Sequence, residues 1–166
     1  MSQPEELRTD PRKRIFKELD DVRAGMLGIE GSEQLSQPMT HHAFPEEGVL
    51  RFITSRQTDL AEAIGSGRTA RYVVISKNHD FWMTLRGEMT VSNDREKIDE
   101  IWSRVSAAWF DEGREDPEVT MLELRLTDGS AWAATGNPLV FGWEILRANM
   151  DEEHKPEIGE QAEIRF

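Results

Sequence analysis

The stretch Val49-Leu50-Arg51-Phe52-Ile53-Thr54-Ser55-Arg56-Gln57-Thr58-Asp59 decides the fold, because an apolar strand passes directly into a helix here. Residues 49–55 predict the strand, and residues 58–64 predict a short helix with Thr58 as its N-cap. Free N–H groups at the helix start, neighbouring hydroxyls and the Arg56 guanidinium suit a phosphate group. The same pattern also fits an ordinary strand-to-helix connection, so the residues alone leave both interpretations open.

Around this stretch, short extended segments alternate with turns. Asp128-Gly129 predicts a two-residue hairpin turn. Gly87 predicts a bend or bulge within a long strand. The regular strand–helix alternation of a parallel sheet is missing, so we expect a mainly β protein with about six strands, an antiparallel barrel with helices packed outside. The extended segments cover residues 26–29, 36–43, 49–55, 69–76, 81–91, 120–126 and 130–135.

Capping signals predict two further helices in the first two-thirds of the chain. Asp10 and Pro11 are suited to the N-cap and first position of a helix that ends at Gly25. Asn93 and Glu96 have the spacing of a capping box, with Asn93 as the N-cap.

The 166 residues are expected to form one domain. Residues 1–9 are expected to be a flexible tail. Residues 136–166 form a C-terminal helical and extended extension, whose helix begins at Asn137-Pro138 and runs to about residue 149. The last nine residues of the sequence form either an edge strand or a tail.

Composition excludes several classes of function. The net charge of −12 argues against non-specific binding to nucleic acid or to an anionic membrane. The absence of cysteine excludes disulfides, zinc ribbons, iron–sulfur clusters and thiol catalysis. The N-terminus shows no signal peptide and no apolar run is long enough to span a bilayer, so a cytoplasmic protein is expected.

Three local patterns carry candidate chemistry besides the strand-to-helix stretch. His41 and His42 are adjacent, and neighbouring side chains on a strand point to opposite faces, so no metal site is expected from this pair. Trp109 and Phe110 can edge a pocket or pack in the core. The acidic clusters are expected to be solvated surface. No nucleophile elbow, phosphate-binding P-loop or dinucleotide fingerprint occurs.

In its order of segments the chain resembles the general-stress-protein branch of the pyridoxamine 5′-phosphate oxidase-like, FMN-binding split-barrel family. The resemblance extends from about Arg12 to Thr135. It implies a split β-barrel with a six-stranded, Greek-key-like arrangement, a homodimer, and two FMN sites at the subunit interface, with FAD as the alternative flavin. The segments that carry the resemblance are Phe52-Ile53-Thr54-Ser55-Arg56, Asp94-Arg95-Glu96-Lys97-Ile98-Asp99-Glu100-Ile101-Trp102 and Ala108-Trp109-Phe110-Asp111-Glu112-Gly113-Arg114-Glu115-Asp116-Pro117.

The resemblance also assigns flavin-binding positions. Met39, Thr40 and His41 are implied to lie along the flavin ring, and Phe52 and Ile53 to line it. Trp109 is included as an edge of the pocket. The residues implied to approach the phosphate are Thr54, Ser55, Arg56 and Thr58.

Two positions depart from the family pattern. Leu60 stands where many relatives have a lysine, with Asp59 beside it, so a weaker anion site is expected. Trp82 stands near the position where the vitamin-processing oxidases have a polar residue that contacts the flavin of the partner chain. Both departures reduce the similarity to that oxidase chemistry.

The function implied is that of an FMN-binding, general-stress-type flavoprotein that is redox-active on a small molecule. Two alternatives stay open: a flavin-binding or storage module without turnover, and an oxidase or reductase for a pyridoxal-like or other small aromatic substrate. No residue is an evident general acid or base, so no catalytic residue is assigned. Substrate and electron donor are left open.

Overall fold

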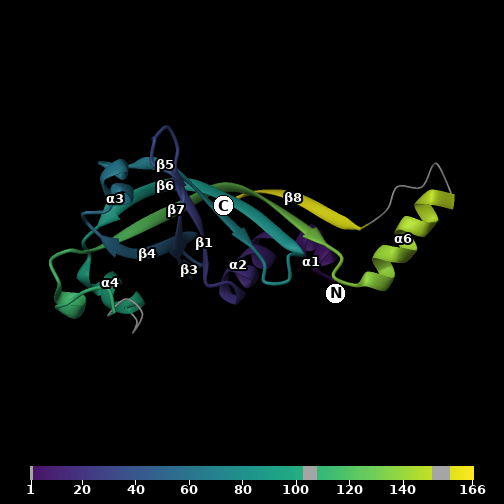
Figure 1. Cartoon of the computed structure of the whole chain (residues 1–166), viewed down its shortest axis with the longest axis horizontal. Coiled ribbons are helices and arrows are strands. Elements are labelled where there is room, and N and C mark those ends of the chain that lie inside the picture. The colour runs from purple at the N-terminus through teal and green to yellow at the C-terminus, as the bar shows by residue number, and fades with distance from the viewer. Residues whose placement is uncertain (1, 103–107, 151–157) are drawn as a thin grey trace.

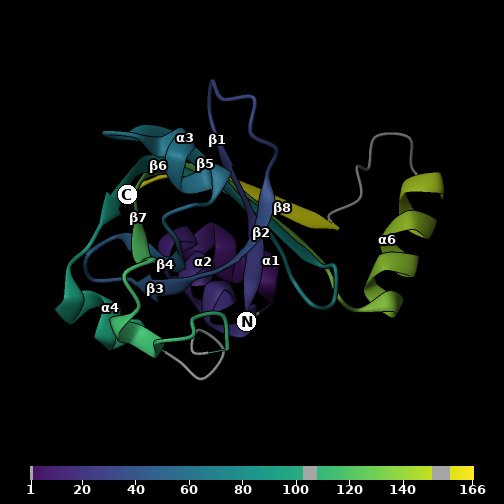
Figure 2. The same ribbon diagram turned by 60° about the vertical axis from the view of Figure 1, so that its left-hand side comes forward.

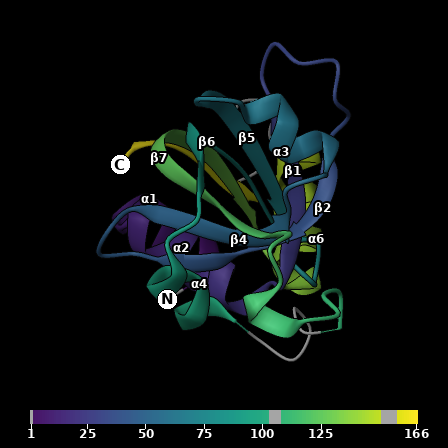
Figure 3. The same ribbon diagram turned by 90° about the vertical axis from the view of Figure 1, so that its left-hand side faces the viewer.

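The computed structural model describes residues 2–102, 108–150 and 158–166, and its strands form one strongly curled antiparallel sheet (Figures 1 and 3). The strands are β1 (Ala24–Ile29), β2 (Gln37–Thr40), β3 (His42–Phe44), β4 (Val49–Ser55), β5 (Arg68–Ile75), β6 (Phe81–Ser92), β7 (Val119–Ala134) and β8 (Gly159–Arg165). Their order is β2-β1-β5-β6-β7-β4-β3, and β8 also pairs with β7. The expected mainly β, split-barrel architecture is confirmed, with eight strands in place of the smaller number expected.

The sheet curls because one short segment belongs to both of its edges. β2 pairs with β1 at one edge, whereas β3 pairs with β4 at the other edge. Only His41 separates these two strands in the sequence. The single strand that we expected over 36–43 is therefore wrong, because the chain leaves one edge at Thr40 and joins the opposite edge at His42.

β7 is one continuous strand of 16 residues, and the hairpin turn expected at Asp128-Gly129 is wrong. β6 pairs along both halves of β7, and the register shifts between Arg86 and Gly87, which confirms the expected bulge. The Asp128 carboxylate accepts a hydrogen bond from Arg86 Nε at 3.1 Å across the strands. Long-range pairing thus overrides the local turn preference of this dipeptide. β4 and β8 share the other side of β7.

Two N-terminal helices, α1 (Gln3–Thr9) and α2 (Pro11–Asp21), pack on the inner face of the sheet (Figure 1). Asp10 caps α2 and Pro11 begins it, as expected, but the helix ends at Asp21, before Gly25. The structure has a helix where we expected a flexible tail: Ser2 caps α1, and Leu7 is buried.

Both ends of the chain meet in this core. α1 packs against β7 and β8. The rings of Phe16 and Phe166 are in edge contact, with their centroids 6.0 Å apart. The last residues therefore form an edge strand, β8, and not a tail.

The other helices lie at the ends of the sheet. Thr58 caps α3 (Asp59–Ile64) as expected, through Ala61 N–H. α4 (Arg95–Ile101) is capped by Asp94 and not by Asn93, because the Asn93 side chain instead accepts a hydrogen bond from Thr120 Oγ1 at 3.0 Å. A short 3-10 helix covers Gly113–Glu115. The expected C-terminal helix is confirmed as α6 (Pro138–Met150), which stands away from the sheet (Figure 2).

Within the described ranges, no helix has the length and apolar content needed to cross a membrane.

The bulge at Gly87 gives a first testable prediction. A Cβ at this position would collide with the Arg125 carbonyl group of β7, so Gly87→Ala is expected to lower the free energy of unfolding by about 1–3 kcal/mol. Gly142→Ala is the matched control, because a Cβ on this α6 glycine meets no atom within 4 Å. The control should leave stability unchanged or raise it by up to about 1 kcal/mol. Urea unfolding measures both, and equal stability of the two variants would contradict the prediction.

Candidate functional site

A cavity of about 1020 Å³ opens beside the closure of the sheet. Its walls come from the end of α2, from β2 and β3, from the end of β4, from α4, and from the segment that follows α4. Apolar side chains alternate with hydroxyl, imidazole and charged groups around it. The lining residues are Leu19, Asp20, Val22, Arg23, Pro38, Met39, Thr40, His41, His42, Ala43, Phe44, Ile53, Thr54, Ser55, Thr58, Glu100, Ile101, Trp109 and Phe110.

Most of the residues assigned from the sequence meet at this cavity, although they come from three separate segments. One group comes from β2 and its end, and the second from β4 and the following turn. Trp109 is 81% exposed and forms an edge of the cavity. The assigned residues that line it are Met39, Thr40, His41, Ile53, Thr54, Ser55, Thr58 and Trp109.

Four assigned residues do not line the cavity in the described part of the chain. Phe52 and Leu60 are fully buried in the main core, so Leu60 occupies the position as a packing residue beneath α3. Arg56 and Asp59 are exposed beside Thr58. The Arg56 backbone N–H donates to Glu118 O at 2.9 Å, and its guanidinium has no ion-pair partner among the described residues.

The hydroxyls at the end of β4 differ in what they can still donate. Thr58 Oγ1 donates to Ser55 O at 2.9 Å and accepts from Ala61 N–H, so its single proton is already used. Ser55 Oγ accepts from Gln57 N–H at 3.3 Å, which leaves its own proton available. Thr54 Oγ1 lies 3.5 Å from Thr58 Oγ1. Ser55 and Arg56 are therefore the donors with free capacity for an anion at this rim.

His41 is buried at the closure and binds three elements together. Its Nε2 lies 2.8 Å from Leu19 O, and because a carbonyl can only accept, this nitrogen carries a proton. Its Nδ1 lies 2.7 Å from the Tyr72 hydroxyl, which also donates to Met39 O at 2.8 Å. Burial raises the pKa of Tyr72 far above its usual value, so this hydroxyl remains a donor. The Met39 backbone on the cavity wall is thus held through β5.

Burial also determines the charge of the two histidines at the cavity. It lowers the pKa of His41, and this effect outweighs the Leu19 hydrogen bond and the Asp20 carboxylate, which both favour the imidazolium. Burial, with the neighbouring His41, likewise lowers the pKa of His42. Both rings are therefore neutral at pH 7. In neutral His41 the Nδ1 atom can only accept, so it shares the single Tyr72 hydroxyl proton with Met39 O.

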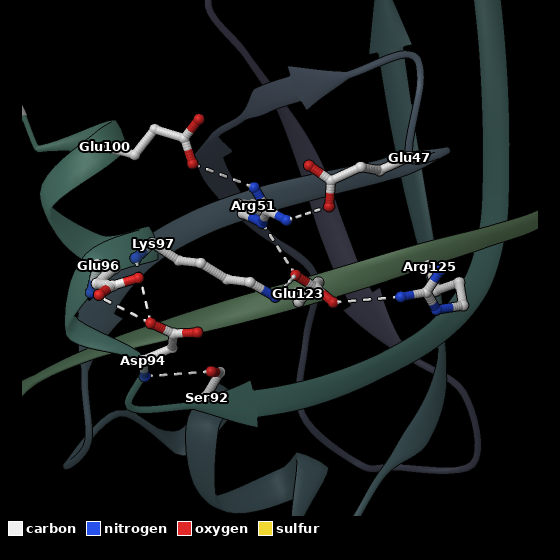
Figure 4. Close-up of polar contacts among 9 residues, drawn as sticks. All are labelled: Glu47, Arg51, Ser92, Asp94, Glu96, Lys97, Glu100, Glu123 and Arg125. Carbon is white, nitrogen blue, oxygen red and sulfur yellow. Dashed lines mark hydrogen bonds and ion pairs between the residues drawn. The ribbon is translucent and has the colours of Figure 1, made fainter.

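Arg51 fixes the opposite wall of the cavity (Figure 4). Only 1% of its side chain is exposed, and its guanidinium pairs with Glu123 of β7 at 2.9 Å, with Glu47 of the preceding turn, and with Glu100 of α4 at 3.5 Å. It also lies 4.1 Å above the Phe44 ring. Burial disfavours the cation, but the hydrogen bonds and charges of Glu123 and Glu47 raise the pKa of Arg51.

Lys97 completes this cluster and connects α4 to the sheet a second time. Its Nζ lies 3.3 Å from Glu123 Oε2. Burial raises the pKa of the Glu123 carboxyl, but Arg51 and Lys97 outweigh it, and the net shift is downward. Since Glu100 and Ile101 line the cavity, the cluster positions one of its walls.

Sequence reasoning missed several lining residues. Arg23 follows α2 and lines the cavity, and its side chain has no ion-pair partner among the described residues. Glu100 and Ile101 appeared in the sequence only as parts of a helix. A lone arginine next to Asp20 and Asp21 gives no local signal, because the segment that faces it, residues 38–44, lies far along the chain.

No group of three described histidine or acidic side chains could hold a metal ion.

Replacement of Arg51 tests the cluster. Arg51→Met keeps an unbranched apolar side chain but removes three ion pairs and the guanidinium above Phe44. Loss of a wholly buried pair costs about 3–5 kcal/mol, and because Glu47 and Glu100 are half-exposed, we expect a loss of about 2 kcal/mol or more. Arg71→Met, which removes the exposed pair with Glu30, is the control and should cost about 1 kcal/mol or less. Urea unfolding of both variants decides, and equal losses would refute the assignment.

The lowered pKa of His41 predicts a dependence of stability on pH. Below pH 6.5 the unfolded chain binds a proton on this ring while the folded chain resists it. Stability is therefore lost as pH falls from 6.5 toward the lowered folded pKa. We expect His41→Gln to reduce this loss, measured by urea unfolding above and below pH 6.5. The exposed His79→Asn is the control, and a pH dependence unchanged in both variants would show that His41 does not contribute.

Known proteins resemble this chain in sequence and in structure. The sequence matches the pyridoxamine 5′-phosphate oxidase like family over residues 10–157. A structure from Jannaschia sp., described as a general stress protein 26, is 36% identical with a TM-score of 0.80, and the match covers 95% of this chain and 99% of that one. The general stress FMN/FAD binding protein from Xanthomonas citri is 29% identical, with a TM-score of 0.67 over 75% of this chain and 90% of that one.

A more distant structure shares the fold alone. A pyridoxamine 5′-phosphate oxidase-related, FMN binding protein from Nostoc punctiforme is 13% identical, with a TM-score of 0.59 over 95% of this chain and 98% of that one. No curated protein matches the sequence. From the family match, the curled sheet and the Jannaschia relative together, we conclude that the chain belongs to the pyridoxamine 5′-phosphate oxidase-like family of split barrels and is similar to its general stress proteins.

Proposed function

We propose that the cavity binds a flavin, FMN in preference to FAD, in a stress-associated flavoprotein. The observation that carries this proposal is a cavity of about 1020 Å³ that combines apolar walls with the hydroxyl groups at the end of β4, where the exposed Arg56 follows directly. The isoalloxazine ring of a flavin needs apolar walls, and its phosphate needs hydrogen-bond donors. The names of the Xanthomonas citri and Nostoc punctiforme structures, which describe flavin-binding proteins, support the same choice.

The residues present fit the two ends of such a ligand. Ser55 and the unpaired Arg56 guanidinium offer the phosphate a hydroxyl and a charged donor, with Thr54 and Thr58 beside them. Asp59 adds a negative charge next to this rim and weakens it. Leu60 makes no contribution, because its side chain packs in the core.

The ring occupies the apolar part of the cavity. Met39, Ile53 and Trp109 provide its contacts, while Thr40 contributes a hydroxyl group and the neutral His41 contributes the surface of its ring, because both ring nitrogens already have partners. The Tyr72 hydrogen bond to Met39 O holds this wall in place. Bound flavin supplies the electron transfer, and the protein supplies binding and orientation. We assign a redox role on a small molecule, with no catalytic side chain.

A second copy of the chain closes the open side of the cavity in this proposal. Trp109, which is exposed at the cavity edge, gives the apolar contact for such a partner. A homodimer with two flavin sites along its seam follows.

Replacement of Arg56 tests the phosphate rim. Charge-assisted hydrogen bonds contribute about 1.5–3 kcal/mol, so Arg56→Ala should weaken FMN by at least about tenfold, while riboflavin, which lacks the phosphate, changes little. Fluorescence titration of the apo-protein measures both affinities. Equal weakening of both ligands would place the arginine away from the phosphate.

Arg68→Ala is the matched control for charge. Arg68 is exposed and does not line the cavity, so its loss changes the net charge of −12 by the same amount as the loss of Arg56. Its FMN affinity should match that of the parent protein. If the purified protein binds neither flavin at micromolar concentration, the proposal fails. Bleaching of a bound flavin by NADH or NADPH then separates a redox enzyme from a flavin carrier.

A further inference from the structure

α6 is an apolar helix that the described residues leave exposed. None of its 13 residues is buried, and its large apolar side chains are distributed around it and not along one stripe. Trp143, for example, is 63% exposed. A helix that is apolar all round is normally buried. The exposed large apolar side chains are Leu139, Val140, Phe141, Trp143, Ile145, Leu146 and Met150.

Among the described residues, the sheet of the same chain does not cover the helix. β7 and β8 are paired as far as Ala134 and Gly159, and the Thr135 N–H then donates to Ile158 O at 2.8 Å. These pairs hold the two chain segments on either side of α6, at residues 135 and 158, together at the end of the sheet. Figures 1 and 2 both show α6 beyond that end, directed away from the strands.

The outer face of the same sheet carries an unpaired apolar patch of three side chains. Ile75 of β5 lies opposite Trp82 of β6, which lies opposite Trp132 of β7. Directly paired residues share one face of a sheet, so the three form a row. Ile75 is 47% exposed and Trp132 39% exposed. The row ends two residues before the last residue of β7, close to the base of α6.

The helix and the patch match in size and in charge. Three neighbouring strands, about 4.8 Å apart, make a row about 10 Å wide, which is the width of one helix with its side chains. α6 contains one acidic residue, Glu144, and one basic residue, Arg147. It is therefore neutral in a chain of net charge −12, and two such chains repel each other least where uncharged surfaces meet.

We propose that α6 is an exchanged arm, which packs on the Ile75–Trp82–Trp132 patch of a second copy of this chain. Arm and patch are on the same molecule, and in the described part of the chain the arm is uncovered and the patch only partly covered. A two-fold axis covers both at once, because the arm of each copy lies on the patch of the other. This contact needs no flavin, so it can hold or fail independently of the proposed cofactor.

Cross-linking tests the exchange directly, since the chain has no cysteine and introduced thiols are unique. Chains with Leu146→Cys are mixed with chains carrying Ile75→Cys, allowed to exchange, and treated with a short bismaleimide. The expected product has twice the chain mass. Leu35→Cys, on an exposed loop residue, replaces Ile75→Cys in the control mixture and should give little product. Equal yields in both mixtures would overturn the proposal.

The double variant Ile75→Cys/Leu146→Cys distinguishes exchange from folding back. If the arms are exchanged, the cross-linked product of this variant is a dimer. If α6 instead lies on the patch of its own chain, both thiols are consumed within one chain and the mass does not double, which overturns the proposal. Trp143→Gln/Leu146→Gln should weaken the dimer at least tenfold in sedimentation experiments, without a change in melting of the monomer. Leu35→Gln should have no effect. A double glutamine variant that dimerises like the parent protein also overturns the proposal, whether or not FMN binds.

Discussion

The closure of the sheet at His41 is the constraint on which the rest of the molecule depends. A single residue separates a strand of one edge from a strand of the other, so the sheet has to curl until these edges meet. The His41 side chain is hydrogen-bonded to α2 and to Tyr72 of β5, and the Met39 carbonyl beside it accepts from the Tyr72 hydroxyl. The polar groups buried at the junction therefore have hydrogen-bond partners, which avoids the free-energy cost of burying them unpaired. The cavity lies beside this junction, and its shape follows from the curl.

The second constraint is electrostatic, and it acts on the opposite wall. Arg51 is buried beneath α4 and pairs with carboxylates from three different segments. A cation in this position is stable only while its carboxylate partners surround it. The helix is therefore kept at one place on the sheet, although it has only seven residues. Apolar packing by Ile98 and Ile101 supports the same position.

The parts of the fold that depend on neighbouring residues could be predicted from the sequence. β4, the Thr58 cap and the bulge at Gly87 are set by local pattern and by the absence of a side chain. Asp128-Gly129 has the chemistry of a turn, yet it lies within β7, because β6 and β8 pair with it on both sides. Asp94 caps α4 in place of Asn93, because the Asn93 side chain accepts a hydrogen bond from Thr120 of the distant strand β7.

The same distinction applies to the site. Ser55 and Thr58 are recognisable because strand end and helix start adjoin in the sequence, whereas Arg23 and Glu100 reach the cavity only through the topology. That Leu60 is buried could not be predicted from its standing where many relatives have a lysine. Its burial depends on the core residues that pack against α3.

The meeting of the two chain ends has a consequence for biosynthesis. α1 is synthesised before its partner β8, and Phe16 has to await Phe166. Until then, the apolar faces of α1 and α2 have only part of their cover. The nascent chain therefore carries exposed apolar surface until β8 has been made, and its core is completed as a unit only then.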